Sequence, residues 1–356
     1  MSRNMTETNK KVFSKLTRLV EQAGVAHHVP ALQAPRWIKT SDEEKDLLKN
    51  ANHETSIECL PGKWASLISH KAQLLIVLPE SQSATSTLKD VRSHTPNAGL
   101  LTLLWSLDSY NPISINDVGA KIAENLYGVS GGYEASAITP YFQPLMVFET
   151  DRHTRGDDPE SLVYKVYGAF LLGRSADIPL PYSTPTRARI IELLEGECGN
   201  IASDILFRAI TASHWTHAFL DFYRCIERLY QAPYVEELRK GLGTASHLSL
   251  GEQISKSLDW RPKEDHALKR LLKDLANTAI ITRLHGTFCK SQPTPNSDLS
   301  DSVGGSIYKI RNGIAHFRSS KNSTQTFNAI EWDQAIEVLC ELISELYKAY
   351  GSIIRV

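Results

Sequence analysis

The chain has 356 residues, of which 42% are hydrophobic and 22% are charged, and its formal net charge is −1. This length predicts two domains at about 100–200 residues each, and the apolar fraction excludes a disordered or collagen-like chain. The longest apolar run, residues 74–78, is far shorter than the ~20 residues of a membrane helix, so we expect no membrane partner. Because the net charge is near zero, any polyanion must bind to a local patch.

The first part of the chain mixes helix and strand signals. Apolar residues recur at helical spacing between Val12 and Val20. Ser41 and Glu44 have the spacing of a capping box, which predicts a short helix through Leu48. Runs of apolar residues predict strands at 74–78, 100–107, 145–148 and 162–172. We therefore expect a mixed α/β domain over residues 1–185.

A proline-rich segment at residues 178–185 is the predicted domain boundary, since proline disfavours both helices and central strands. Beyond it, the apolar residues follow a helical period in four segments: 212–230, 268–279, 307–317 and 336–350. We expect residues 195–356 to form an all-α domain of four or five helices, packed as an antiparallel bundle. The overall fold class is then α+β.

The five cysteines are well separated along the chain, at positions 59, 198, 225, 289 and 340. None forms a CxxC pair, so we expect neither a disulfide framework nor a structural zinc site. The first residues contain no apolar stretch that would make a secretory signal. Reduced cysteines and the lack of such a signal predict a cytoplasmic protein.

One segment contains several basic residues and no acidic ones. Residues 302–330 contain no Asp or Glu, but they contain Lys309, Arg311, Arg318 and Lys321. Such a cationic strip is suited to binding phosphate groups, although a solvated basic surface has the same composition.

Within this strip, Arg311, Asn312 and His316 combine residue types that suit acid–base chemistry on a phosphate. Asn312 and His316 are four residues apart and share a face of a helix, where an amide can orient an imidazole. Arg311 lies about 140° around the helix from His316. Its long side chain can bend towards the same cavity, and two facing copies of the helix would bring the pair together more naturally.

The segment from Arg311 to His316 resembles the motif of the HEPN superfamily, whose α-helical domains include many RNases. That motif is an Arg, a polar residue that is often Asn, a few further residues and a His, near the start of a late helix. Residues 218–227, with an aromatic-rich face and an acidic residue, are similar to the opening helix of the family. The resemblance covers roughly residues 195–356. Two other Arg–His pairs lack the polar second residue: Arg208 with His214, and Arg261 with His266.

The resemblance implies an endoribonuclease that needs no metal and no cofactor. RNA supplies its own nucleophile, the 2′-hydroxyl. His316 would be the general acid/base, Arg311 the phosphate clamp, and Asn312 the residue that positions His316. The other cations of the strip would assist RNA binding: Lys309, Arg318 and Lys321. The expected products carry a 2′,3′-cyclic phosphate and a 5′-hydroxyl.

In this family two protomers usually pair so that two motifs line one cleft, which implies a homodimer through the C-terminal domain. Because an unregulated RNase is toxic, residues 1–185 are expected to be a sensor or regulatory domain with a protein or nucleotide trigger. The setting would be antiviral defence or a toxin-like stress response.

Two alternatives remain open at this point. A catalytically inert HEPN-like module would use the same strip to bind nucleotides, RNA or protein. Alternatively, residues 1–190 would hold an unrecognised enzyme, and the helical domain would only dimerise the chain.

Other polar features are better explained by structure than by chemistry. The pair His27 and His28 has no further ligand at metal spacing. The cluster Asp151, His153, Asp157 and Asp158 has the pattern of a solvated turn, and residues 129–133 lack the spacing of a nucleotide loop. Two residues of the segment 218–227 line the cleft, support the Arg311 strip or form a surface ion pair: Arg224 and Glu227.

Overall fold

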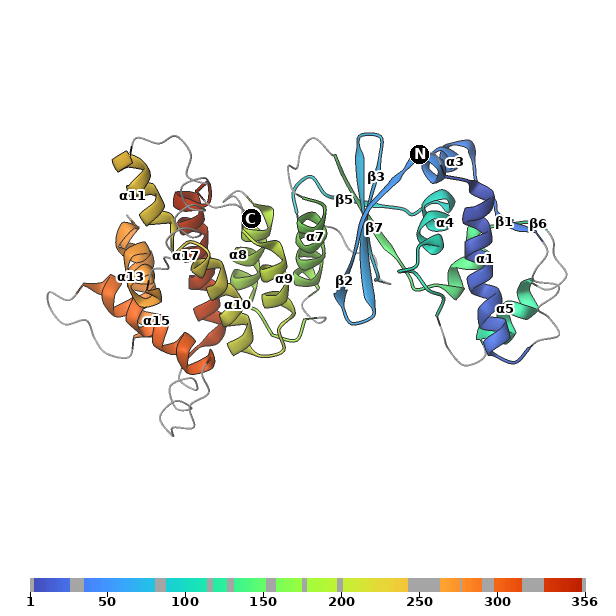
Figure 1. Ribbon diagram of the computed structural model, residues 1–356. Helices are drawn as coiled ribbons and strands as arrows, with labels where there is room; N and C mark the ends of the chain where they lie inside the picture. The colour runs from blue at the N-terminus through green and yellow to red at the C-terminus, as the bar shows by residue number, and fades with distance from the viewer. Residues whose placement is uncertain are drawn as a thin grey trace. The chain divides into compact units, whose positions relative to one another are not determined.

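The computed structural model describes residues 3–25, 35–80, 88–113, 118–126, 131–151, 158–174, 178–196, 201–242, 263–275, 277–289, 298–315 and 330–353. The chain is mixed α+β (Figure 1). It divides into two compact units, Met1–Val166 and Tyr167–Val356. The division falls inside helix α7 (Pro159–Gly173), and the proline-rich segment at 178–185 lies within the second unit.

The first unit contains a five-stranded antiparallel sheet in the order β2-β3-β4-β7-β5. At its centre, Ile76 is paired with Leu67 on one side and with Phe148 on the other. The strands predicted at 74–78 and 145–148 are confirmed as β4 and β7. The strand bounds are β2 (Asn52–Leu60), β3 (Lys63–His70), β4 (Gln73–Leu78), β5 (Arg92–His94) and β7 (Met146–Asp151).

Three helices of the first unit, α1, α3 and α4, begin where the sequence supplies a capping side chain. The capping box is present at α3, where Ser41 Oγ accepts from the Glu44 amide at 3.3 Å and Glu44 Oε2 accepts from the Ser41 amide at 2.7 Å. Asn4 caps α1 by accepting from the amides of Thr6 and Glu7. The helix bounds are α1 (Met5–Gln22), α3 (Asp42–Asn50), α4 (Ala98–Ser106), α5 (Val118–Leu126) and α6 (Ala135–Ile138), with a 3₁₀ turn η2 (Thr139–Tyr141).

The strand predicted at 100–107 is wrong, because this segment is helix α4. Leu100, Leu103 and Leu104 share a core cluster with residues of the sheet. Leu101 and Trp105 share a different cluster with residues of α1, and α4 lies between α1 and the sheet in Figure 1. A helix buried on two sides shows no amphipathic period, so its sequence resembles that of a buried strand.

The strand predicted at 162–172 is wrong for the same reason. This segment is part of α7, and every residue from Lys165 to Leu172 is buried. Val, Tyr and Phe favour strands only weakly, and burial around the whole helix overrides that preference.

A second, two-stranded parallel sheet joins β1 (Arg36–Ile38) to β6 (Gly131–Tyr133). It lies against α1, where the side chain of Asn9 accepts a hydrogen bond from the Ile38 amide at 2.8 Å. This contact fixes the position of β1 along the helix.

Every element of the second unit within the described residues is helical. Residues 195–356 hold seven described helices, more than the four or five expected. The segment predicted as one helix at 268–279 is divided between α13 and α14, and α9 and α11 were not predicted. Pro233 is an early residue of α11, where proline is tolerated. The helices are α8 (Thr184–Glu195), α9 (Ser203–Thr211), α10 (Trp215–Glu227), α11 (Ala232–Leu242), α13 (Glu264–Asp274), α14 (Thr278–Phe288), α15 (Leu299–Ala315) and α17 (Trp332–Tyr350).

In this unit α10 contacts α9, α13, α15 and α17. The aromatic face of α10 supplies much of the core, with Phe219, Phe222 and Tyr223 fully buried. Among the helices of the described ranges, none is long and apolar enough to cross a membrane.

Candidate functional site

Helix α15 carries three of the predicted site residues. Val303, Ile307 and Ile310 are buried on one side of the helix. Lys309 is exposed, whereas Arg311 is partly covered, with 19% of its side chain accessible.

Helices α13 and α15 run side by side in opposite directions (Figure 1). Lys273, near the end of α13, donates to Asp301 at the start of α15 at 2.9 Å. At the other end of the pair, Glu264 opens α13 and lies 3.4 Å from Arg311 near the end of α15. The antiparallel packing thus brings the first turn of α13 to the arginine of the motif.

Arg311 is held chiefly by Glu227, the last residue of α10. Its Nε and Nη2 atoms both donate to Glu227 Oε1, at 3.1 and 2.9 Å. Charge-assisted contacts of this kind fix the orientation of a guanidinium group. The sequence left the role of Glu227 open, and the structure favours the alternative in which Glu227 supports Arg311. Arg224 instead pairs with Asp221 in its own helix.

Asn312 is the third partner of the guanidinium, and its Oδ1 accepts from Arg311 Nη1 at 2.9 Å. The sequence predicts that this amide positions His316, and that contact lies outside the described residues. Arg318 and Lys321 lie outside the described residues as well. The described part of the site is therefore the arginine with its acidic and amide partners.

Burial and neighbouring charges have opposite effects on the pKa values of Glu227 and Arg311. Burial raises the pKa of Glu227, and the positive charge of Arg311 opposes the rise. Burial would lower the pKa of Arg311, but the two glutamates outweigh it and the pKa is raised overall. Arg311 therefore stays charged, and it shares its charge with Glu227 and Glu264.

Two tyrosine hydroxyls lie beside the ion pair. Tyr223 and Tyr230 hydrogen-bond to each other through their hydroxyl groups, and both side chains are buried. Burial raises the pKa of each phenol, so both remain neutral donors and acceptors at neutral pH.

The sequence did not single out Glu264, Tyr223 or Tyr230 as site residues. No sequence motif links Glu264 to Arg311, and only the packing of α13 on α15 brings the two residues together. Its one sequence signal is its place in the acidic first turn of a helix.

Chemically, the arrangement presents an oriented guanidinium whose side chain is 19% accessible. An incoming phosphate would have to compete with Glu227 and Glu264 for its N–H groups. Within the described ranges, no group of three or more His, Cys, Asp or Glu side chains is arranged to hold a metal ion. The histidines at 27 and 28 and the polar cluster after Asp151 lie outside those ranges, except for Asp158.

Comparison of the chain with protein-family models, with curated proteins and with solved structures gives no match. A function for this chain is therefore inferred from the residues of the site.

Proposed function

We propose that the chain is a metal-independent endoribonuclease of the HEPN type, with Arg311 and His316 as its catalytic pair. The observation that carries the proposal is the fixed guanidinium of Arg311, held by Glu227 and Asn312. An arginine oriented by neighbours can bind a phosphate and stabilise the charge that develops on its oxygens. His316 follows Asn312 by four residues, which places an acid–base group close by in sequence.

In the proposed reaction, His316 takes the proton of the RNA 2′-hydroxyl. The 2′-oxygen then bonds to phosphorus while the bond to the 5′-oxygen breaks, and the leaving oxygen is protonated by an acid. The acid is His316 of a second chain in the homodimer, or water. The products carry a 2′,3′-cyclic phosphate and a 5′-hydroxyl, and the reaction needs no metal because RNA supplies the nucleophile.

The same proposal includes a biological role. Free RNase activity harms its own cell, so we place the chain in the cytoplasm as an effector of antiviral defence or of a toxin-like stress response. The first unit would then regulate the second.

A growth experiment tests this proposal. The wild-type chain, Arg311→Ala and His316→Ala are induced in a bacterial host, and RNA integrity is followed in each culture. His266→Ala is the matched control, since His266 is an exposed histidine of α13 outside the motif. We expect arrest and RNA fragmentation with the wild type and the control only. Equal arrest with His316→Ala would contradict the proposal.

A second function is favoured by one observation, the pairing of Arg311 with two carboxylates. Two carboxylates on one guanidinium weaken its attraction for a further anion. A catalytically inert module that binds nucleotides, RNA or protein would be compatible with this arrangement. It would leave RNA intact, and Arg311→Ala would change binding alone.

A further inference from the structure

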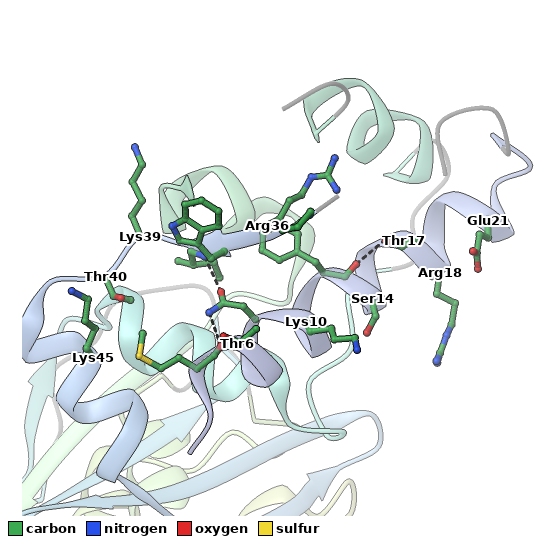
Figure 2. A pocket seen from close by; sticks show the side chains of 16 residues that line it. Thr6, Lys10, Ser14, Thr17, Arg18, Glu21, Arg36, Lys39, Thr40 and Lys45 are labelled. Atoms are coloured by element: carbon green, nitrogen blue, oxygen red, sulfur yellow. Dashed lines mark hydrogen bonds between the residues drawn. The ribbon is translucent and has the colours of Figure 1, made fainter. Parts of the chain in front are cut away.

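A groove in the first unit has no role in the site described above. It lies along α1 and β1 and has a volume of about 1050 Å³ (Figure 2). Sites for small organic ligands typically have volumes of about 300–1,000 Å³, so the groove has room for a ligand larger than a single sugar or amino acid.

The groove is cationic although the chain as a whole is nearly neutral. Its lining includes Lys10, Arg18, Lys39 and Lys45, and Glu21 is its only acidic member among the described residues. Lys10, Ser14 and Arg18 are spaced four residues apart, so they share one face of α1, as Figure 2 shows.

Lys10 and Arg18 are the most available cations of this groove, whereas Lys45 pairs with Asp42 at 2.8 Å. Lys10 and Arg18 are exposed, and neither has an ion-pair partner among the described residues. Lys39 pairs with Glu134 at 2.9 Å, but both side chains are more than half exposed, so the pair is weak and exchangeable. The buried Arg36 binds the backbone instead, since its Nη2 donates to the Leu126 carbonyl at 3.2 Å.

Trp37 supplies a planar surface in the same groove. It is 49% exposed, an unusual exposure for a large aromatic side chain. Trp37 and Lys39 are alternate residues of an extended segment, so their side chains leave it on the same side.

Strand β6, which pairs with β1, leaves room for the side chain of Trp37. A Cβ atom at Gly132 would lie 2.7 Å from the indole Nε1 and 2.8 Å from Lys39 Cγ. Only a glycine leaves room for both side chains, because such contacts are shorter than van der Waals distance. The glycine pair of β6 therefore seats the indole against the backbone and leaves its remaining surface open.

We propose that this groove binds a nucleotide with two or more phosphates, with its base stacked on Trp37 and its phosphates bound by Lys10, Arg18 and Lys39. An aromatic surface beside exposed cations matches both halves of such a ligand. The groove is built on a helix and a strand that Asn9 holds together, so the backbone positions from which its side chains extend are fixed relative to each other. All of these residues lie in the first unit, and the proposal does not depend on the ribonuclease activity.

Calorimetric titration of the full chain with ATP tests this proposal. Adenosine and tripolyphosphate are titrated in parallel, because each carries one half of the ligand. We expect ATP to bind, each half to bind more weakly, and ATP affinity to fall as salt is raised.

Variants then locate the site. Trp37→Ala is expected to weaken ATP binding about tenfold or more, whereas Trp37→Phe keeps a stacking surface and stays close to the wild type. The double variant Lys10→Ala/Arg18→Ala should weaken binding and reduce its salt dependence. Lys11→Ala is the matched control, since Lys11 is an exposed lysine of α1 outside the groove. Circular dichroism checks that each variant is folded.

Three results would overturn the proposal. One is a wild-type chain that does not bind ATP. Another is tripolyphosphate binding as tightly as ATP, which would indicate a simple cationic surface. The third is ATP binding that survives Trp37→Ala but is lost in Arg311→Ala, which would place the ligand in the second unit.

Discussion

Arg311 and Glu227 meet through two nitrogens and one oxygen: Nε and Nη2 of the guanidinium both donate to Oε1 of the carboxylate. The contact joins the end of α10 to the end of α15, which are 84 residues apart in sequence. It fixes the orientation of the Arg311 guanidinium and offsets part of its positive charge. The same contact therefore bears on the stability of the second unit and on its affinity for anions.

Removal of Arg311 should make stability depend on pH. Burial holds the pKa of Glu227 above its ordinary value of 4.5, and Arg311 opposes this rise, so in Arg311→Ala the pKa climbs further. A carboxyl with a raised pKa in the folded state stabilises the fold below its unfolded pKa, and that contribution is lost as pH rises through the folded pKa. We expect a loss of about 1–2 kcal/mol at pH 7 that shrinks towards pH 4.

Urea unfolding of the wild type and Arg311→Ala at several pH values measures this loss. Lys348→Ala is the control, because Lys348 forms an exposed pair with Glu345. A deficit that stays constant from pH 7 to pH 4 would show that Glu227 does not respond to Arg311.

Glu264→Gln should strengthen RNA binding. Glu264 lies 3.4 Å from Arg311 and is 42% exposed, so it lowers the charge of the arginine without being its main anchor. The neutral glutamine leaves Glu227 in place and returns part of the positive charge to the site. We expect RNA affinity to rise a few-fold at low salt, with a smaller gain at high salt.

Filter binding or fluorescence anisotropy with labelled RNA measures this change. Glu345→Gln removes the same charge from an exposed pair of α17 and serves as the control. Equal gains in both variants would indicate an effect of net charge alone.

Two glycines inside helices should respond to alanine in opposite ways. A Cβ at Gly99 of α4 would overlap the Glu44 carbonyl oxygen, whereas a Cβ at Gly305 of α15 meets nothing within 4 Å. Gly99→Ala should therefore destabilise the first unit by about 2 kcal/mol or more, as overpacking does. Gly305→Ala should stabilise the second by up to about 1 kcal/mol, because alanine favours helices.

Thermal unfolding of both variants checks this contrast. A rise in the melting temperature of Gly99→Ala would contradict the close approach of α4 to α3.

The sequence predicted best the elements that carry a strong local signal. The capping box at Ser41 and the apolar strand at residues 74–78 depend on local residues, and both are confirmed. Helices α4 and α7 were misread because they are buried on more than one side and lose the helical period. Strands β2 and β3 were not predicted because polar residues such as His53, Glu54 and Ser66 interrupt their apolar pattern.

Of the candidate site, sequence spacing identified Arg311 and Asn312 as neighbours on a late helix, and the structure places them there. A contact between Glu227 and Arg311 was only one of the alternatives that the sequence left open. Glu264 and the groove around Trp37 depend on contacts between segments distant in sequence, which no local pattern encodes.

The most direct test of the central proposal is cleavage of RNA by the purified full chain in EDTA, beside the same RNA with 2′-O-methyl groups. The proposal predicts that the wild type cuts only the unmodified RNA and leaves 2′,3′-cyclic phosphate ends, and that His316→Ala and Arg311→Ala are inactive although folded. Cleavage of the 2′-O-methyl RNA, or full activity of His316→Ala, would contradict it.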